Sequence, residues 1–351
     1  MDRTGAKELM RIGIINDTRG PNSHIGCAMV MLNLERLLAQ HGMSVAFFWP
    51  AGKNWTDYQD ELYQKCLDGR ISAVIVNGEG TLHHSEARPN ANALAEIASF
   101  VDTRLGIPAY IINATFFANS PGFYKKIEGF RSIYVRDKAS LVELHRYGVA
   151  GTHVPDLTLA FPLEEGKNHR DGIGATDSVY PEVSADLQHC SAQNDWEFQL
   201  MAARYPLHLA KITAPRKFAR TLRGAIRERR FIKLTKDPKK FTDWLRSKEL
   251  IITGRYHTVT TCLLTKTPFV AIESNTPKIS SLLSDVFGSN RRVVHALHQL
   301  TPSETESYKK FSEEERARLD MFLGHAERGC ADMIAEIKSN ILASRPSSNT
   351  R

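Results

Sequence analysis

Short apolar runs alternate with longer amphipathic segments along most of the 351 residues. The short runs are rich in β-branched residues and predict strands, whereas the longer segments carry apolar residues at helical spacing. In the first part of the chain we expect strands at 10–16, 44–49, 73–77, 109–113 and 132–135, and helices at 25–40, 55–67, 90–105 and 138–147. This alternation is typical of βαβ units and predicts a doubly wound domain around a parallel sheet.

The pattern is interrupted between 149 and 168 by prolines and glycines, and it begins again near Gly172. Further strands are expected at 231–234, 250–253, 269–272 and 292–294, and a last helix at 312–342. The chain is therefore predicted to be an α/β protein of two Rossmann-like domains that face a cleft, followed by a C-terminal helix. The predicted boundaries are 10–160 for the first domain, 168–300 for the second, 305–343 for the helical segment and 344–351 for a mobile tail.

Composition narrows the class of protein. A chain of this length with 42% hydrophobic residues can bury two cores. The five cysteines are scattered without a CxxC pair or a metal-ligand spacing, so we expect reduced thiols and no metal site. The first ten residues lack the apolar run of a secretory signal, and no stretch of eighteen apolar residues occurs. We expect a cytoplasmic protein, and peripheral attachment to the inner face of the membrane stays open.

The net charge of +7 arises from basic residues that are concentrated in one segment. Between Lys211 and Lys240 there are twelve Lys and Arg residues against two acidic ones, an excess larger than the charge of the whole chain. This segment is either a solvated helix face or a surface for an acidic polymer, a lipid-linked phosphate or an anionic membrane. Its only aromatic residues are Phe218 and Phe231, which argues against single-stranded nucleic acid as a partner.

Ligands of open parallel sheets bind beyond the carboxyl ends of the strands, so motifs there matter most. The first is the polar loop Asn16-Asp-Thr-Arg-Gly-Pro-Asn-Ser-His-Ile-Gly26, in which Arg19, Asn22 and His24 are candidates to face the cleft. Its backbone N–H groups suit an anion, although the GxGxxG spacing is absent and an ordinary βα loop explains it equally well.

The second motif is Val76-Asn-Gly-Glu-Gly-Thr-Leu-His-His84, which follows another predicted strand. Its glycines allow a sharp turn, and Glu79, His83 and His84 then supply groups for acid–base chemistry near neutral pH. A third candidate is Arg136, at the end of a buried strand. This arginine either pairs with a carboxylate such as Asp137 or projects toward an anion.

Two strand ends in the second half complete the set. Ile251-Ile-Thr-Gly-Arg-Tyr-His257 delivers Arg255 and His257 just before a helix, an arrangement that suits a phosphate or carboxylate ligand. Ala271-Ile-Glu-Ser-Asn-Thr-Pro-Lys278 places Lys278 at the start of the next helix, with Asn275 or Thr276 as the expected N-cap and Pro277 as the first helical residue.

The segment from Leu250 to Lys278, with its Gly-Arg-x-His element, resembles the C-terminal signature of polysaccharide pyruvyl transferases. The resemblance extends to Arg131-Ser-Ile-Tyr-Val-Arg-Asp-Lys-Ala-Ser140, to Pro155-Asp-Leu-Thr-Leu159 and to Asn77-Gly-Glu-Gly-Thr-Leu82. It implies a glycosyltransferase-B-like pair of domains and a transferase that moves pyruvate from phosphoenolpyruvate to a sugar of a cell-surface polysaccharide or its precursor, forming a ketal. The implied acceptor is a glycan or a lipid-linked sugar.

The resemblance also implies roles for the candidate residues. It implies that Arg255 and His257 bind or protonate the donor, that Arg136 holds its phosphate or carboxylate, and that His83 is a further donor contact. The requirements of the chemistry add Lys278 and Asn275 to donor binding, with His257 or His83 as the acid and Glu79 or a histidine as the base. No cofactor and no metal are expected. The first loop is longer than the family's short Asn-x-Gly-Asp element, and Arg19, Asn22 and His24 are placed on the acceptor side.

Two alternatives keep other classes open: a glycosyltransferase that uses a nucleotide sugar, and a non-catalytic binder of acidic polymers through 211–240. The acceptor sugar and the oligomeric state are not fixed by the sequence.

Overall fold

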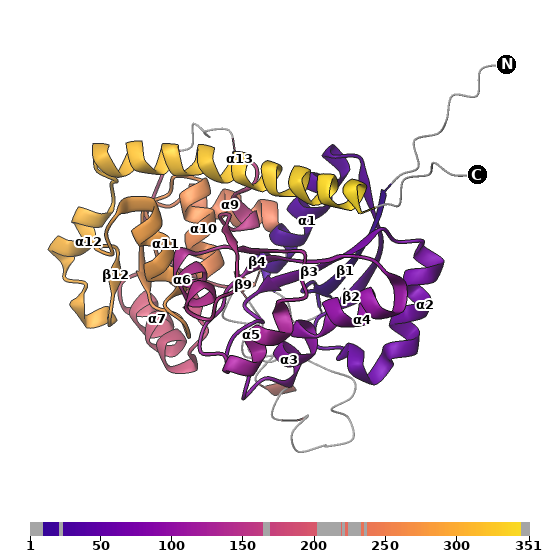
Figure 1. Cartoon of the computed structure of the whole chain (residues 1–351). Coiled ribbons are helices and arrows are strands. Elements are labelled where there is room, and N and C mark those ends of the chain that lie inside the picture. The colour runs from indigo at the N-terminus through magenta and orange to yellow at the C-terminus, as the bar shows by residue number, and fades with distance from the viewer. Residues whose placement is uncertain are drawn as a thin grey trace, which may run out of the picture. The chain divides into compact units, whose positions relative to one another are not determined.

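The computed structural model describes residues 10–20, 24–163, 169–201, 219, 222–223, 233–234 and 237–344. They form two compact units (Figure 1). Of the described residues, unit 1 contains those up to Thr18, Met31–Ala160 and those from Ala326 onward. Unit 2 contains Arg19–Val30 and Phe161–His325. The chain therefore changes unit within the first helix and again within the last.

Unit 1 is built on a six-stranded parallel sheet with the strand order β2-β1-β3-β4-β5-β6. Its strands are β1 (Met10–Asp17), β2 (Met43–Pro50), β3 (Ala73–Glu79), β4 (Ala109–Ala114), β5 (Ser132–Val135) and β6 (Thr152–His153). Every residue of β3 and β4 is buried, as expected for central strands with covered faces. These two strands form the middle of the unit's core.

The helices that belong wholly or in part to unit 1 are α1 (Ile25–Gln40), α2 (Gln59–Gly69), α3 (Pro89–Ala95), α4 (Ile97–Leu105), α5 (Pro121–Ile127), α6 (Lys138–Arg146) and α13 (Glu313–Ala343). Helices α1 to α6 connect the strands of unit 1, and α13 follows the last strand of the chain. Both α1 and α13 also contribute residues to unit 2. Figure 1 shows α13, of 31 residues, as one unbroken helix. Its later part packs on unit 1: the Cys330 thiol contacts the Pro155 carbonyl and Lys338 donates to the His41 carbonyl at 2.7 Å.

Unit 2 also has a parallel sheet, with the order β12-β11-β10-β7-β8-β9. Its strands are β7 (Ile173–Ser178), β8 (Glu197–Leu200), β9 (Lys233–Leu234), β10 (Leu250–Gly254), β11 (Phe269–Ile272) and β12 (Val293–Val294). The described helices of unit 2 include α7 (Pro181–Gln193), α9 (Pro238–Arg246), α10 (Tyr256–Leu264), α11 (Lys278–Phe287) and α12 (Pro302–Tyr308). The core lies on β7, β10 and β11.

The prediction of two α/β domains with parallel sheets and a helical C-terminus is confirmed. One predicted helix is wrong in detail, because 90–105 forms α3 and α4. The break is at Glu96, whose amide bonds to the Ala93 carbonyl three residues back, a tightened turn that ends the first helix. The described residues of 19–30, which fall in the predicted first domain 10–160, belong to unit 2. The predicted helical segment 305–343 is divided between the units at Ala326. Most of the basic segment 211–240 and all but Ser344 of the tail lie outside the described residues.

Candidate active site

The sheet of unit 2 reverses its strand order between β7 and β10. The chain builds β8 and β9 outward from one side of β7, and then β10, β11 and β12 outward from the other. Ligands of open parallel sheets bind beyond the carboxyl ends of the strands at such a reversal. Asp177 is near the end of β7 and Arg255 directly follows β10. The two side chains form an ion pair at this point.

This ion pair uses only part of the hydrogen-bonding capacity of the arginine. Asp177 is buried and also accepts a hydrogen bond from the Met201 amide at 3.0 Å. The Arg255 side chain is 17% exposed, and its Nε has no hydrogen-bond partner among the described residues. A guanidinium has five N–H donors, and Asp177 holds it in place through one of its terminal nitrogens. Arg255 is thus positioned and retains donors for a phosphate or carboxylate.

Gly254 is required by the close approach of β7. A Cβ at this position would lie 2.4 Å from the Ser178 Cβ and 2.5 Å from its hydroxyl oxygen. No side chain fits there without displacing β7, which carries Asp177. The glycine before Arg255 therefore sets the spacing of the two strands at the reversal.

His257 lies in the first turn of α10 and is 6% exposed. The sequence placed both Arg255 and His257 just before a helix; in the structure only Arg255 precedes the helix, with an extended backbone, and the helix begins at Tyr256. The His257 ring lies 5.0 Å from that of His24, between ring centroids. A Cβ at Gly26 would lie 2.2 Å from the His257 Cγ, so this glycine lets the start of α1 approach the imidazole.

The start of α11 differs from the predicted cap. The helix begins at Lys278, and neither Asn275 nor Thr276 is its N-cap residue. Instead the Glu273 carboxylate accepts from the amides of Ile279 and Ser280, at 3.2 and 3.0 Å. Because Glu273 accepts from these amides of the first turn, they are not available to bind an anionic ligand. The group of this element that can attract an anion is therefore the Lys278 ammonium. Its ammonium donates to the Asn275 side chain at 3.1 Å and lies 6.0 Å from the Tyr256 ring centroid, at the start of α10.

Unit 1 has its own reversal, between β1 and β3. Polar side chains from the two strand ends are joined there. The Asn16 amide donates to the Asn77 carbonyl at 2.6 Å and to the Thr81 hydroxyl at 3.0 Å. The Glu79 carboxylate accepts from Asn77 at 2.8 Å and from Thr18 at 2.7 Å. The carboxylate is thus fixed at the place where this sheet is expected to bind a ligand.

The backbone at this edge adopts an uncommon conformation. Asn16, Glu79 and Asn113 have φ values of 67°, 30° and 55°, at the carboxyl ends of β1, β3 and β4. Non-glycine residues with positive φ concentrate at functional sites. The turn was expected at the glycines, but Gly78 serves a different purpose: a Cβ there would lie 2.5 Å from the Ala114 Cβ.

The histidines of this motif have unequal access. His83 is 1% exposed, whereas His84 is half-buried and has a φ of 53°. Their Nδ1 atoms are 2.6 Å apart. The more accessible imidazole is therefore His84, although His83 was the predicted catalytic residue.

Arg136 follows β5 and lies inside unit 1. It is 2% exposed, and its guanidinium donates to Asp156 and to the Thr115 hydroxyl, both at 2.9 Å. Of the two fates expected for this arginine, the structure shows pairing, with Asp156 and not with Asp137. Asp137 instead caps α6 by accepting from the Ser140 amide at 2.8 Å. Arg136 thus connects two of the motifs that carried the family resemblance.

A sequence model of the family described as polysaccharide pyruvyl transferase matches residues 24–276. The chain belongs to the polysaccharide pyruvyl transferase family. It is therefore a transferase by family, and the matched range includes both reversal points, from Asn77 and Glu79 to Asp177 and Arg255. A search of curated proteins found no match to the sequence.

Three solved structures have the same fold. They are MnaA of S. aureus solved with UDP (11% identity, TM-score 0.57, 97% of this chain and 100% of that chain covered), UDP-GlcNAc 2-epimerase from Neisseria meningitidis (10%, 0.54, 95% and 100%) and UDP-GlcNAc 2-epimerase from Methanocaldococcus jannaschii (13%, 0.53, 94% and 100%). At these identities the similarity concerns the fold alone. It supports the expected glycosyltransferase-B-like architecture.

The structure groups the predicted site residues of this family member by unit. Arg255, His257, Asn275 and Lys278 lie in unit 2, and Arg19 and His24 belong to that unit as well, although the loop was predicted on the acceptor side. Glu79 and His83 lie in unit 1, and Asn22 is outside the described residues. Sequence reasoning missed Asp177, Glu273 and Asn16. For Asn16 and Glu273 the available signal was a polar residue at the end of a predicted strand, whereas no strand range was predicted around Asp177.

The cysteines, the arrangement of metal-ligating residue types and the hydrophobicity of the helices bear on which other kinds of site the described residues could form. All five cysteines are free, and burial raises the pKa of Cys66 to about 12. Among the residues that the structure describes, no group of three or more His, Cys, Asp or Glu side chains is placed to hold a metal ion. Within the same residues no helix has the length and apolar character needed to cross a bilayer.

Proposed function

We propose that the protein transfers the pyruvyl group of phosphoenolpyruvate to two hydroxyl groups of one sugar in a polysaccharide or its precursor, forming a ketal. The observation that carries this proposal is Arg255 at the reversal point of unit 2, held by buried Asp177 in a chain of this family. The acceptor is a glycan or a lipid-linked sugar.

Donor binding is assigned to unit 2. Phosphoenolpyruvate carries a phosphate and a carboxylate, and Arg255 has donors left for one of them. Lys278 adds a second cation, and Asn275 orients its ammonium. No cofactor is needed, because the donor itself supplies the activated group. Arg136 is omitted from this set, because its guanidinium is buried against Asp156 and Thr115.

The chemistry requires one acid and one base. His257 is the acid that adds a proton to the methylene carbon of the donor, which turns that carbon into the methyl group of the product. A sugar hydroxyl then attacks the neighbouring carbon. Phosphate leaves from that carbon, and a second hydroxyl closes the ketal. Of the two hydroxyl protons, one balances the proton added to carbon and the other leaves with phosphate. The ring of His24 beside His257 places a second imidazole on the donor side.

Acceptor chemistry is assigned to unit 1, where Glu79 is the base that receives a hydroxyl proton. Its carboxylate is oriented by Asn77 and Thr18. His84, the accessible imidazole of the motif, is a contact for the sugar, whereas buried His83 positions it.

Product analysis in deuterium oxide tests the reaction. The protein is incubated with phosphoenolpyruvate and oligosaccharides that end in different hexoses, and the product is examined by proton NMR and mass spectrometry. Because the added proton comes from a group that exchanges with solvent, each product methyl group should carry one deuterium, and one phosphate should be released per ketal.

Calorimetric binding of the donor makes the test independent of the acceptor. Phosphoenolpyruvate should bind the wild type and Arg318→Ala, a control at an exposed arginine outside the site, but not Arg255→Ala. Binding of a UDP-sugar without binding of phosphoenolpyruvate would instead assign the protein to glycosyl transfer.

A further inference from the structure

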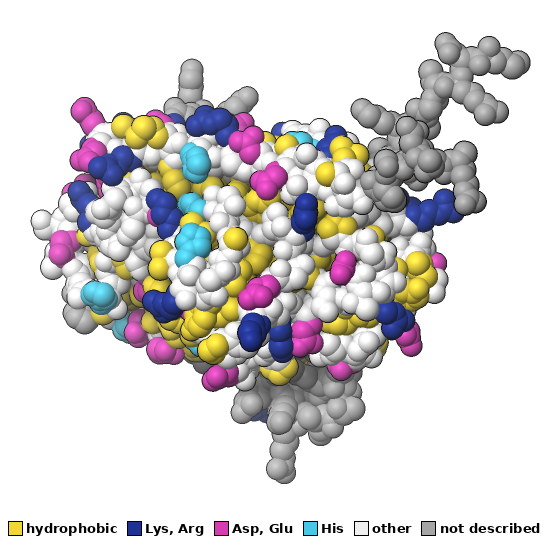
Figure 2. Space-filling view, viewed as in Figure 1, with side chains coloured by type: hydrophobic (Ala, Val, Ile, Leu, Met, Phe, Trp, Pro, Cys, Tyr) yellow, Lys and Arg dark blue, Asp and Glu magenta, His cyan; other side chains and the backbone are white. Residues whose placement is uncertain are grey.

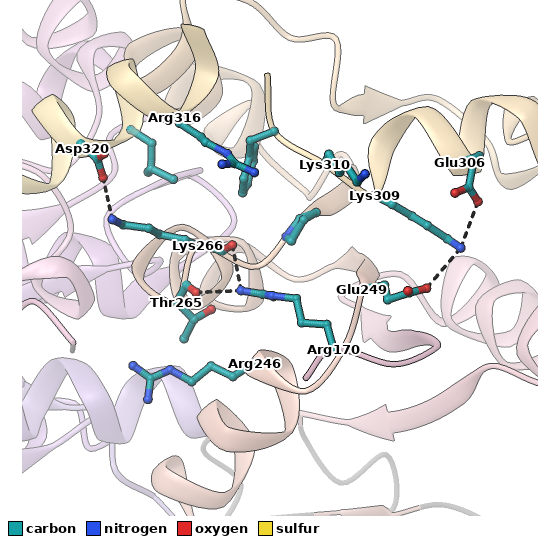
Figure 3. A pocket seen from close by; sticks show the side chains of 13 residues that line it. Arg170, Arg246, Glu249, Thr265, Lys266, Glu306, Lys309, Lys310, Arg316 and Asp320 are labelled. Atoms are coloured by element: carbon teal, nitrogen blue, oxygen red, sulfur yellow. Dashed lines mark hydrogen bonds and ion pairs between the residues drawn. The ribbon is translucent and has the colours of Figure 1, made fainter. Parts of the chain in front are cut away.

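A second cluster of charged side chains lies at the amino ends of the unit 2 strands, at the other end of the sheet from Arg255. A pocket of about 760 Å³ opens at the amino ends of β7, β10 and β11, where Arg170, Glu249 and Pro268 precede the strands (Figure 3). Glu249 directly precedes β10 and Arg255 directly follows it, so the length of the strand separates this pocket from the candidate active site. The helix α10 likewise begins directly after Arg255 and ends at Leu264, just before Thr265 and Lys266 in the pocket wall.

The charges around the pocket are unbalanced. Three carboxylates line it, Glu249, Glu306 and Asp320, against six cations: Arg170, Arg246, Lys266, Lys309, Lys310 and Arg316. Two of the lysines account for all three acids, because Lys266 pairs with Asp320 at 2.9 Å and Lys309 pairs with Glu249 and Glu306 at 3.2 and 3.0 Å. On the surface seen in Figure 2, Lys and Arg side chains are interspersed with Asp and Glu. A local excess of cations around a cavity therefore stands out.

Two cations of the rim have no carboxylate partner. Among the described residues, neither the Lys310 ammonium nor the Arg316 guanidinium forms an ion pair. Figure 3 shows both on the side of α12 and α13, across the pocket from Arg170 and Arg246. Positive groups on opposite walls raise the potential inside the cavity, and a bound anion relieves their repulsion.

The walls are held rigidly from behind. Arg170 donates to the carbonyls of Lys248, Thr265 and Lys266, at 3.2, 3.3 and 3.0 Å. Burial lowers the pKa of Arg170, and the neighbouring Arg246 lowers it further. On the other wall, buried Arg292 donates to the Lys310 carbonyl at 2.8 Å and so fixes the segment that carries Lys310. The pocket is thus preformed, as small-molecule sites usually are.

We propose that this pocket binds a soluble organic diphosphate of nucleoside diphosphate size. The phosphates lie between Arg170 and Arg316, and the organic part lies toward Phe311 and Leu319, which together with Pro268 are the apolar residues of the lining. A nucleoside diphosphate carries about three negative charges near neutral pH, which matches the excess of cations. The volume is within the range of about 300–1,000 Å³ typical of ligand pockets. A polyanionic polymer fits less well, because the exposed carboxylates of Glu306 and Asp320 would repel it.

Calorimetry with the full-length protein tests the site, with adenosine diphosphate and uridine diphosphate as probes. The pocket variant is Lys310→Ala/Arg316→Ala. The matched control, Arg318→Ala/Arg328→Ala, removes two charges at exposed positions of α13 outside the pocket. At least one nucleotide should bind the wild type. Its affinity should fall roughly tenfold for each cation removed, and it should be unchanged in the control. Circular dichroism verifies that both variants are folded.

Two further arms separate the pocket from other binding modes. Arg255→Ala should retain the nucleotide affinity; loss of binding in Arg255→Ala with full binding in the pocket variant would place the ligand at the β7–β10 reversal and overturn the proposal. Cosedimentation with phosphatidylglycerol vesicles tests a lipid headgroup as the source of the phosphate. Binding to vesicles without binding of either nucleotide would overturn the proposal, and so would the absence of both.

Discussion

Arg136 and Arg255 each directly follow a strand of their own unit's sheet, yet they differ in what surrounds them. Arg136 is 2% exposed and bonded to Asp156 and Thr115, whereas the Arg255 side chain is 17% exposed with one carboxylate partner. Arg255 follows the strand at the reversal of its sheet, and Arg136 follows β5, away from the reversal of its own. We therefore propose a ligand-binding role for Arg255 and a structural role for Arg136.

The largest expected effect is on catalysis. Arg255→Ala should lower kcat/KM for phosphoenolpyruvate by about 10²–10³-fold, because it removes a charge aimed at the donor. Steady-state kinetics at saturating acceptor measure this, with Arg318→Ala as the matched control. Arg255→Lys keeps the charge on Asp177 paired and should recover only part of the activity. Unchanged kinetics in Arg255→Ala would remove the distinction between the two arginines.

At Arg136 we expect the substitution to reduce the stability of the fold and not to act directly on donor binding. Arg136→Ala removes the guanidinium that pairs with buried Asp156 at 2.9 Å, which should lower the free energy of unfolding by about 3–5 kcal/mol. Urea denaturation measures the loss, and Arg136→Met combined with Asp156→Leu should regain much of it because no buried charge remains. A stable Arg136→Ala variant that no longer binds phosphoenolpyruvate would instead place Arg136 in the donor site.

Two glycines test whether strand spacing positions Arg255: Gly254, which directly precedes it, and Gly80, which follows Glu79 in unit 1. Gly254→Ala forces a Cβ against Ser178 and should cost about 1–3 kcal/mol of stability, with weaker donor binding because β7 also carries Asp177. Gly80→Ala is the control, since a Cβ there meets no atom within 4 Å. Thermal unfolding and donor titration compare them. Equal behaviour of the two variants would show that strand spacing does not position Arg255.

The smallest effect concerns a third arginine, Arg292, which is buried like Arg136. Burial alone would raise the pKa of Glu315, but hydrogen bonds from Arg292 and from the Ser312 amide lower it below its ordinary value of 4.5. Since the folded-state pKa is depressed, this pair stabilises the protein above pH 4.5 and loses its effect as the pH falls below that value. Unfolding midpoints of the wild type should therefore fall more steeply below about pH 4.5 than those of Glu315→Gln. Parallel curves would contradict the assignment.

The fold could be predicted because its signals are local. Strand and helix periodicities occupy a few residues each, and the Gly-Arg-x-His element spans only the end of β10 and the start of α10. Partners across the sheet could not be predicted in this way. Asp177 is 78 residues from Arg255, and the two meet only because the sheet places β7 beside β10. The partner of Arg136 was sought at adjacent Asp137, but Asp156 reaches it from 20 residues away.

The close contacts that require glycine could not be predicted from the sequence either. Gly26, Gly78 and Gly254 occur in predicted motifs, but the atoms that exclude a side chain there belong to His257, Ala114 and Ser178. Glu273 precedes the helix that it caps by five residues, a spacing that depends on the path of the intervening loop. These features follow from tertiary contacts, which no single-sequence pattern contains.

The return of α13 to unit 1 also bears on the order in which the protein is made. Buried side chains of this segment, among them Cys330, Ile334 and Ile337, complete a unit whose first strand begins at Met10. During synthesis these residues leave the ribosome after the whole of unit 2. Unit 1 therefore cannot complete its core until unit 2 has been synthesised, and apolar surface of its earlier strands stays exposed until then.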